Sequence, residues 1–151
     1  MPRILGVDYG TRRVGFAISD ELGVLSLPLC TKDVASVQDA VRIARKVADE
    51  RKAIRVVVGL PLNMDGTKGS MAHQVERFVD LLRAGGIHEV ITWDERLSTG
   101  LVERMLIDAD VSRSRRKEVR DKLAAQVILQ GYLDSLAGAP NCDAYGLDPS
   151  L

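Results

Sequence analysis

A continuous run of mainly β-branched residues at 54–60, IRVVVGL, constrains the fold more than any other feature of the sequence. Unbroken apolar runs of this length are typical of strands that are buried on both faces, as in a parallel sheet covered by helices. Parallel neighbours need a crossover between them, which is usually a helix. The run therefore predicts an α/β fold, in which other parts of the chain supply neighbouring strands and covering helices.

Residue patterns on either side of this run predict those elements. Alternation and apolar runs indicate strands, and short turns between the first three favour antiparallel pairing. Helical spacing of apolar residues indicates amphipathic helices, the second of them capped by Ser70. The expected strands are 3–9, 13–20, 24–31, 54–60 and 89–93, and the expected helices are 35–52, 71–84, 99–109 and 117–137.

This order predicts one α/β domain over residues 1–138 and a C-terminal tail over 139–151. The sheet is expected to be mixed and five-stranded, with three antiparallel strands followed by two parallel ones, and flanked by helices. No apolar run approaches the roughly 18–20 residues that cross a bilayer. Cys30 and Cys142 show neither metal-binding nor disulfide spacing. We therefore expect a cytoplasmic protein without a membrane partner.

The basic residues are unevenly distributed along the chain. Lys and Arg total 21 and Asp and Glu total 21, so the formal net charge is zero. Residues 113–122 nevertheless include six basic side chains, whereas the chain from Asp134 onward has three Asp and no Lys or Arg. Such a segment is typical either of a nucleic-acid contact or of a solvated loop that leads into a helix.

Three carboxylates are the main candidates for chemistry. Asp8 closes the first strand and Glu95 follows the fifth, so both are expected at the edge where parallel strands end. Asp121 falls on the apolar stripe of the last helix, with Ala125 and Ile128, where a carboxylate is unfavourable without a cation. Oxygen ligands prefer hard cations, so the three acids predict a site for Mg²⁺ or Mn²⁺. Two such ions about 3.5–4 Å apart can activate water and stabilise the leaving oxygen of a phosphodiester.

Each acid alone also has an ordinary explanation, as a turn former, a surface ion-pair partner or a charge near a helix N-terminus. The turn after Asp8 adds to the case, because Gly10 permits close backbone approach and Thr11 and Arg12 can contact phosphate oxygens. The pattern D-x-G-T also fits the phosphate hairpin of an actin-like ATPase. That class binds nucleotide between two related domains, and 151 residues leave room for one.

Four segments of the sequence resemble the signature segments of the YqgF family, also called RuvX: LGVDYGTRRVGFAISD, VVVGLPLNMDGTKG, TWDERLST and DKLAAQVILQGYL. The resemblance implies an RNase H-like fold with a metal-dependent nuclease site at Asp8, Glu95 and Asp121. It implies trimming of the 5′ end of pre-16S rRNA, with the resolution of four-way DNA (Holliday) junctions as the alternative. In the wider RNase H-like group an acid commonly closes the fourth strand, whereas here that strand ends in Gly59-Leu60-Pro61.

A nucleic-acid substrate needs basic side chains beside the site and, for single strands, an aromatic on which bases stack. Tyr9 and Trp93 are the best-placed aromatics, although packing is the favoured interpretation of both. The expected partners are pre-16S rRNA or branched DNA and the ribosome or its precursor, with the protein a monomer or weak homodimer. An RNA-binding module with an inactive site is the non-enzymatic alternative. The residues expected to contact phosphates are Thr11, Arg12, Arg96, Arg115 and Arg116.

Overall fold

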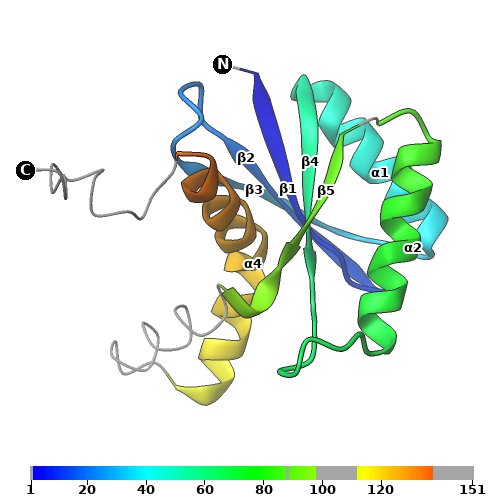
Figure 1. Ribbon diagram of the computed structural model, residues 1–151, viewed down its shortest axis with the longest axis vertical. Coiled ribbons are helices and arrows are strands. Elements are labelled where there is room, and N and C mark those ends of the chain that lie inside the picture. The colour runs from blue at the N-terminus through cyan, green and yellow to red at the C-terminus, as the bar shows by residue number, and fades with distance from the viewer. Residues whose placement is uncertain (1, 88, 98–111, 138–151) are drawn as a thin grey trace, which may run out of the picture.

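Five strands form one mixed sheet in the computed structural model, in the order β3-β2-β1-β4-β5 (Figure 1). Strand β1 pairs antiparallel with β2 and parallel with β4, β2 pairs antiparallel with β3, and β4 pairs parallel with β5. The predicted five-stranded mixed sheet is therefore confirmed, with the 54–60 run inside its central parallel strand. The strands are β1 (Arg3–Asp8), β2 (Arg13–Ser19), β3 (Ser26–Asp33), β4 (Ala53–Leu60) and β5 (Val90–Asp94).

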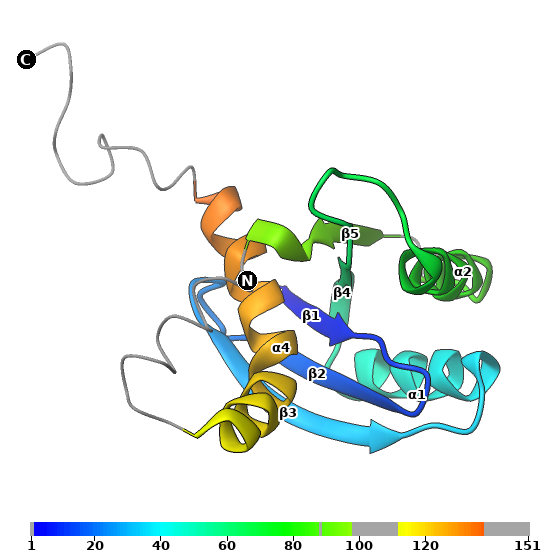
Figure 2. The same ribbon diagram turned by 90° about the horizontal axis from the view of Figure 1, so that it is seen from below.

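Helices cover both faces of this sheet (Figure 2). Helices α1 (Val37–Glu50) and α2 (Ser70–Ala84) pack on one face, and α4 (Arg113–Leu136) crosses the other. A short 3-10 turn, η1 (Glu95–Leu97), follows β5. No helix in the described part of the chain is long and apolar enough to span a membrane.

The structure describes residues 2–87, 89–97 and 112–137, and for 113, 114 and 116–122 it describes the backbone alone. The helix expected at 99–109 and the tail expected at 139–151 lie outside these residues.

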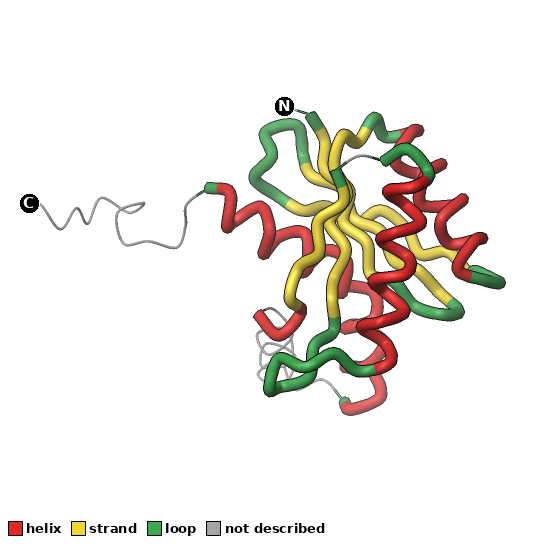
Figure 3. The backbone as a smooth tube through the Cα atoms, turned by 45° about the vertical axis from the view of Figure 1, so that its right-hand side comes forward, coloured by secondary structure: helices red, strands yellow, loops and turns green. Residues whose placement is uncertain are grey.

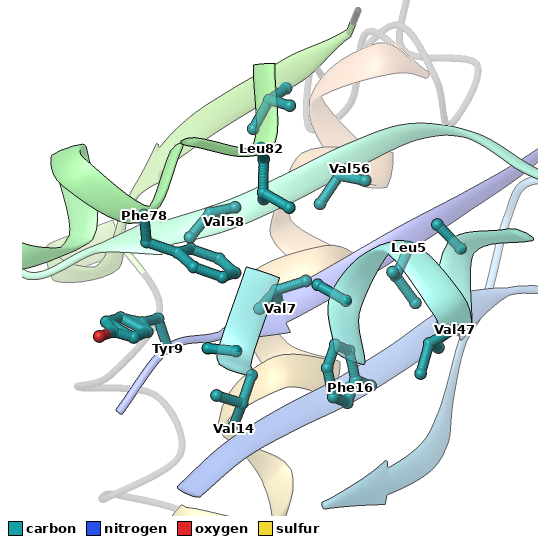
Figure 4. Close-up of a cluster of buried hydrophobic side chains, with 14 of the residues drawn as sticks. Leu5, Val7, Tyr9, Val14, Phe16, Val47, Val56, Val58, Phe78 and Leu82 are labelled. Atoms are coloured by element: carbon teal, nitrogen blue, oxygen red, sulfur yellow. The ribbon is translucent and has the colours of Figure 1, made fainter. Parts of the chain in front are cut away.

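Strand alternation divides the buried core into two layers. Side chains such as Leu5, Val7 and Val58 pack against α1 and α2 in one layer, which Figure 4 shows in close-up. Ile4 and Val57, from the opposite face of the same strands, pack against α4. Because successive side chains of a strand point to opposite faces, the even-numbered positions of β1, including Asp8, belong to the α4 face.

Helix α4 is also fastened to the turn between β2 and β3. The side-chain amide of Gln130 accepts a hydrogen bond from the backbone N–H of Ser26 (2.9 Å) and donates one to the carbonyl of Val24 (2.9 Å). Gln126 donates a third bond, to the carbonyl of Ser26 (3.1 Å). These contacts join residues about one hundred positions apart in the sequence. They anchor α4 to the start of β3 and to the turn before it.

The final helix begins at Arg113, four residues earlier than the sequence pattern predicts. The Ser112 hydroxyl accepts a hydrogen bond from the backbone N–H of Arg115 (3.4 Å), which is a typical N-terminal cap. The basic segment 113–122 is therefore helical, and the interpretation of this segment as a loop that leads into the helix is wrong.

Two other boundaries differ from the expectation. Ser70 is the first residue of α2 rather than its cap; Gly69 holds the cap position and offers no side-chain hydrogen bond. Strand β3 starts two residues later than predicted, because the Asp20 carboxylate accepts hydrogen bonds from the backbone N–H groups of Val24 and Leu25. These bonds hold both residues in the hairpin turn.

Candidate active site

Asp8, at the end of β1, is paired with a glycine of β2. Its register partner on β2 is Gly15. A Cβ atom built on Gly15 would lie 3.8 Å from the Asp8 Cβ and 3.7 Å from the Cβ of Ala125 in α4. The Asp8 carboxyl group therefore lies between the backbone of β2 and α4. Because Gly15 has no side chain, there is space beside this carboxyl group.

The side chain of Glu95, the first residue of η1, lies over the end of β4. A Cβ atom built on Gly59 would lie 2.5 Å from Glu95 Oε1 and would also overlap the Cδ1 of Ile128 in α4. The space that a β4 side chain would take is thus filled by the carboxyl group of Glu95. This gives a physical reason why the residue before the last of β4 is a glycine here and not an acid, since an acid at position 59 and Glu95 would compete for one place.

The Glu95 carboxyl group is electrostatically coupled to Asp8. Burial, and then the negative charges of Asp8 and Asp94, raise the pKa of Glu95 from 4.5 to about 7. Like charges held this close disfavour ionisation, and a bound divalent cation would offset the repulsion. The structure therefore brings two of the three predicted acids together, in an arrangement whose chemistry suits a hard cation.

The raised pKa predicts an unusual pH dependence of stability for the metal-free protein. A carboxyl group that binds its proton more tightly in the folded state stabilises the fold at low pH, and this contribution is lost as pH rises from about 4.5 to about 7. The free energy of unfolding should therefore fall by roughly 2–3 kcal/mol across this range, and the Glu95→Gln variant should lack that fall. Urea unfolding in EDTA at pH 5 and pH 8 measures both, and parallel pH curves for the two proteins would contradict the prediction.

Asp121 lies on the helix that covers these two acids. Its backbone position in α4 is one turn before Ala125, and Ala125 and Ile128 lie over Gly15 and Gly59, respectively. Positions 121, 125 and 128 share one helix face. The Asp121 side chain is not among those described, so its part in the site stays a prediction. Among the described residues, no three Asp, Glu, His or Cys side chains form a group that could hold a metal ion.

A cavity of about 590 Å³ adjoins Asp8 on the side of β2 and β3. Gly10 lies at the rim of this cavity. A Cβ atom on Gly10 would lie 2.5 Å from the carbonyl oxygen of Arg13, so the turn expected after Asp8 is confirmed as one that needs a glycine. Thr11 and Arg12 are both exposed in this turn, and Arg12 lines the cavity. The other lining residues are Gly15, Thr31 and the ion pair of Arg13 with Asp33.

The remaining candidates for phosphate contacts lie elsewhere. Arg115 is exposed in the first turn of α4, and the side chain of Arg116 is outside the described part of the structure. Tyr9 is only 7% exposed and stacks on Phe78, with ring centroids 4.6 Å apart (Figure 4), so its interpretation as a packing residue is confirmed. Trp93 meets Tyr132 edge to face at 6.2 Å.

Arg96 holds the loop that follows β4. Its guanidinium group donates bidentate hydrogen bonds to the Asp94 carboxylate, the shortest of 2.7 Å. It also donates hydrogen bonds to the carbonyl oxygens of Asn63 (3.5 Å) and Met64 (3.3 Å). The loop adds its own bonds, among them Asn63 N–H to the carbonyl of Thr67 (2.9 Å). The hydrogen-bonded loop therefore holds Met64, which is 91% exposed, next to Arg96.

We predict that Arg96→Lys loosens this loop although it keeps the charge. Lysine lacks the planar fork that can bond Asp94 and two carbonyl groups together. Hydrogen exchange of the Gly66 and Thr67 amides should become about tenfold faster, a loss of roughly 1.4 kcal/mol of local stability, while the amides of β1 stay unchanged. Unchanged exchange in the loop would show that Arg96 does not hold it.

The sheet order, with α4 across the face that carries Asp8 and Glu95, defines a fold of the RNase H-like class. Thermus thermophilus RuvC, solved in complex with a Holliday junction substrate, shares this fold at a TM-score of 0.51 and 15% identity, over 91% of this chain and 97% of that one. The sequence profile described as "RuvX: Holliday junction resolvase" matches residues 2–135. The chain belongs to the RuvX family.

Curated relatives match over nearly their whole length. A protein of Geobacillus sp. (strain WCH70) is 48% identical over 135 residues, which cover 88% of this chain and 98% of the relative. One from Bacillus cytotoxicus is 49% identical over 135 residues, again 88% and 98% of the two chains. Both carry the name "Putative pre-16S rRNA nuclease". The resemblance drawn from the sequence segments is confirmed.

Proposed function

We propose that this chain is a divalent-metal-dependent nuclease that processes the 5′ end of pre-16S rRNA. The observation that carries the proposal is the Glu95 carboxyl group, buried over Gly59 and coupled to Asp8. Nuclease relatives at 48–49% identity support phosphodiester hydrolysis as the reaction and rRNA as the substrate class. In this function the protein acts in the cytoplasm on the ribosome precursor, as a monomer or weak homodimer.

Asp8, Glu95 and Asp121 would hold Mg²⁺ or Mn²⁺ in this proposal. When bound, such a cation supplies a Lewis acid that activates water and stabilises the leaving oxygen of the phosphodiester. Gly59 leaves the space in which the Glu95 carboxyl group reaches the site. Ile128 and the α4 backbone exclude water from one side of it, and this strengthens the electrostatic interactions within.

The substrate backbone would enter along the cavity beside Asp8. Arg12 stands at its rim and can pair with a phosphate, and the exposed Thr11 hydroxyl can donate to another oxygen. Arg96, next to Glu95, would guide phosphates there, in addition to holding the loop after β4. Arg115 and Arg116, at the start of α4, would guide phosphates farther from the site.

Resolution of Holliday junctions is the second candidate, which the family description and the shared fold with RuvC favour. A resolvase cuts a four-way junction symmetrically, and this needs two copies of the site in a twofold dimer. Cleavage of an rRNA precursor needs one site. Oligomeric state therefore separates the two candidates as well as substrate does.

A cleavage assay with the purified full-length chain tests the proposal. A precursor 16S 5′-leader RNA and a synthetic four-way DNA junction would each be incubated with Mg²⁺, Mn²⁺ or EDTA. Cation-dependent cutting of the RNA alone supports rRNA processing, and paired symmetric nicks in the junction support the resolvase candidate. Cutting that persists in EDTA would overturn the metal dependence, and binding of RNA without cutting would favour the non-enzymatic module.

A further inference from the structure

A second cavity, lined by basic residues, lies between α1 and the C-terminal end of α2. These two helices lie on the face of the sheet opposite α4 (Figure 3). The volume of this second cavity is about 750 Å³, larger than that of the cavity beside Asp8. Its floor includes the apolar side chains of Val41, Ile54 and Ile87. We call it the α1–α2 groove. None of the residues assigned to the site above lines it.

Four cations line the α1–α2 groove: Arg42, Arg45, Lys46 and Lys52. Asp49 is the one carboxylate among its described lining residues. Arg42 is paired with Asp39, outside the groove, at 2.7 Å. For Arg45, Lys46 and Lys52 the described part of the chain shows no ion pair, so the groove keeps an excess of positive charge although the whole chain is neutral.

Two backbone features shape the groove. Lys52 has φ +55°, which makes it the one described residue other than glycine with a positive φ. A side chain at such a position is unfavourable, and glycine or asparagine is the usual choice. Gly85, at the end of α2, leaves room for Arg45, because a Cβ atom there would lie 3.1 Å from the Arg45 Cδ.

The groove lies at the opposite end of β4 from the acids. Ala53 lines the groove and Gly59 lies under Glu95, so six residues of strand separate them, or about 20 Å at 3.3 Å per residue. The groove and the acids also lie on opposite faces of the sheet, so an RNA contacts both only if it extends farther than this, around the edge of the sheet.

We propose that the α1–α2 groove binds the phosphate backbone of RNA, as a second contact distant from the cleavage site. The choice of RNA as occupant rests on the proposed nuclease function; the excess positive charge of the groove is independent of it. In this arrangement the groove increases affinity for long, structured RNA and leaves the chemistry to the acids.

Binding of a fluorescently labelled stem-loop RNA of about forty nucleotides, measured in EDTA so that no cutting occurs, tests the proposal. The Arg45→Gln/Lys46→Gln double variant removes two cations. Each lost contact changes the salt slope by about 0.7–0.9, which corresponds to about fourfold in affinity near 0.15 M salt. We expect the double variant to bind more than tenfold more weakly and with a shallower salt dependence. Arg51→Gln is the matched control, since Arg51 is an exposed cation next to Lys52 that does not line the groove.

Lys52→Gly adds a test that separates binding from folding. Glycine relieves the unfavourable φ, so this variant should unfold at higher urea concentration than the parent and yet bind the RNA about fourfold more weakly. If the RNA is cleaved, the double variant should raise KM and leave kcat unchanged. Because the binding measurement needs no cleavage, its outcome is independent of whether the nuclease proposal holds.

Three outcomes would overturn the proposal. The double variant could bind the stem-loop RNA as tightly as the parent, or the Arg51→Gln control could weaken binding as much per charge as the groove variants do. The groove residues could instead be needed for binding to anionic lipid vesicles or to an acidic peptide while RNA affinity stays unchanged. Each result would show that the groove does not bind the RNA backbone.

Discussion

Asp8→Asn should reduce cleavage by about a thousandfold or more, because the contribution of a catalytic cation is worth several kcal/mol and asparagine lacks the ligand charge. The fold should survive the change, since it removes a negative charge that raises the pKa of Glu95. In EDTA the variant should be at least as stable as the parent to urea. Added Mn²⁺ should raise the melting temperature of the parent and leave that of the variant unchanged.

Asp80→Asn is the matched control for this experiment. Asp80 lies on α2 with its side chain 78% exposed and takes no part in the proposed site. It should retain the cleavage rate of the parent and its Mn²⁺ response. Full activity in purified Asp8→Asn would rule out Asp8 as a ligand, and a variant that loses both activity and stability would point to a structural role instead.

Gly59→Ala should impair both the fold and the reaction. The added methyl group would lie 2.5 Å from Glu95 Oε1 and would also overlap Ile128, so the carboxyl group and α4 must move. Overpacking of this kind typically lowers the free energy of unfolding by about 1–3 kcal/mol. Displacement of a ligand by about 1 Å can lower the rate by about a hundredfold. Urea unfolding and single-turnover cleavage measure the two effects.

Gly15→Ala is the control for the steric effect of Gly59→Ala, and urea unfolding measures both variants. It makes the same change in β2, which β1 separates from β4, on the same face of the sheet. There the new methyl group would meet its neighbours at 3.7–3.8 Å, an ordinary contact. We expect its free energy of unfolding to stay within about 1 kcal/mol of the parent or to increase, because alanine is less flexible than glycine when unfolded. Equal destabilisation by both substitutions would contradict the role given to the space above Gly59.

The sequence predicted the sheet because its strands are distinct in composition and period. The unbroken run at 54–60 and the short turns between the first three strands left few alternatives. Convergence of Asp8 and Glu95 was also predictable, since Asp8 closes β1 and Glu95 follows β5, and both strands end at one edge. The element ends were less predictable, because they depend on single side-chain bonds, such as those from Asp20 to the amides of the hairpin turn.

The role of Gly59 could not be derived from the pattern of the strand. A glycine near the end of a buried strand indicates close approach by another group, but the identity of that group depends on how η1 turns after β5. Arg96 is a similar case. Its place in the sequence suggests a phosphate contact. Its bonds to the carbonyl groups of Asn63 and Met64 depend instead on the packing of two loops that are about thirty positions apart in the sequence.

The position of α4 in the sequence determines when the site can be completed during synthesis. Residues 2–97, which carry Asp8 and Glu95, leave the ribosome before the helix that covers their face of the sheet. Until α4 packs, Ile4, Ala17 and Val57 remain open to water, and Asp121, the third predicted acid, is not yet near this face of the sheet. A nascent chain that lacks α4 is therefore expected to be inactive, even when Asp8 and Glu95 are already in place.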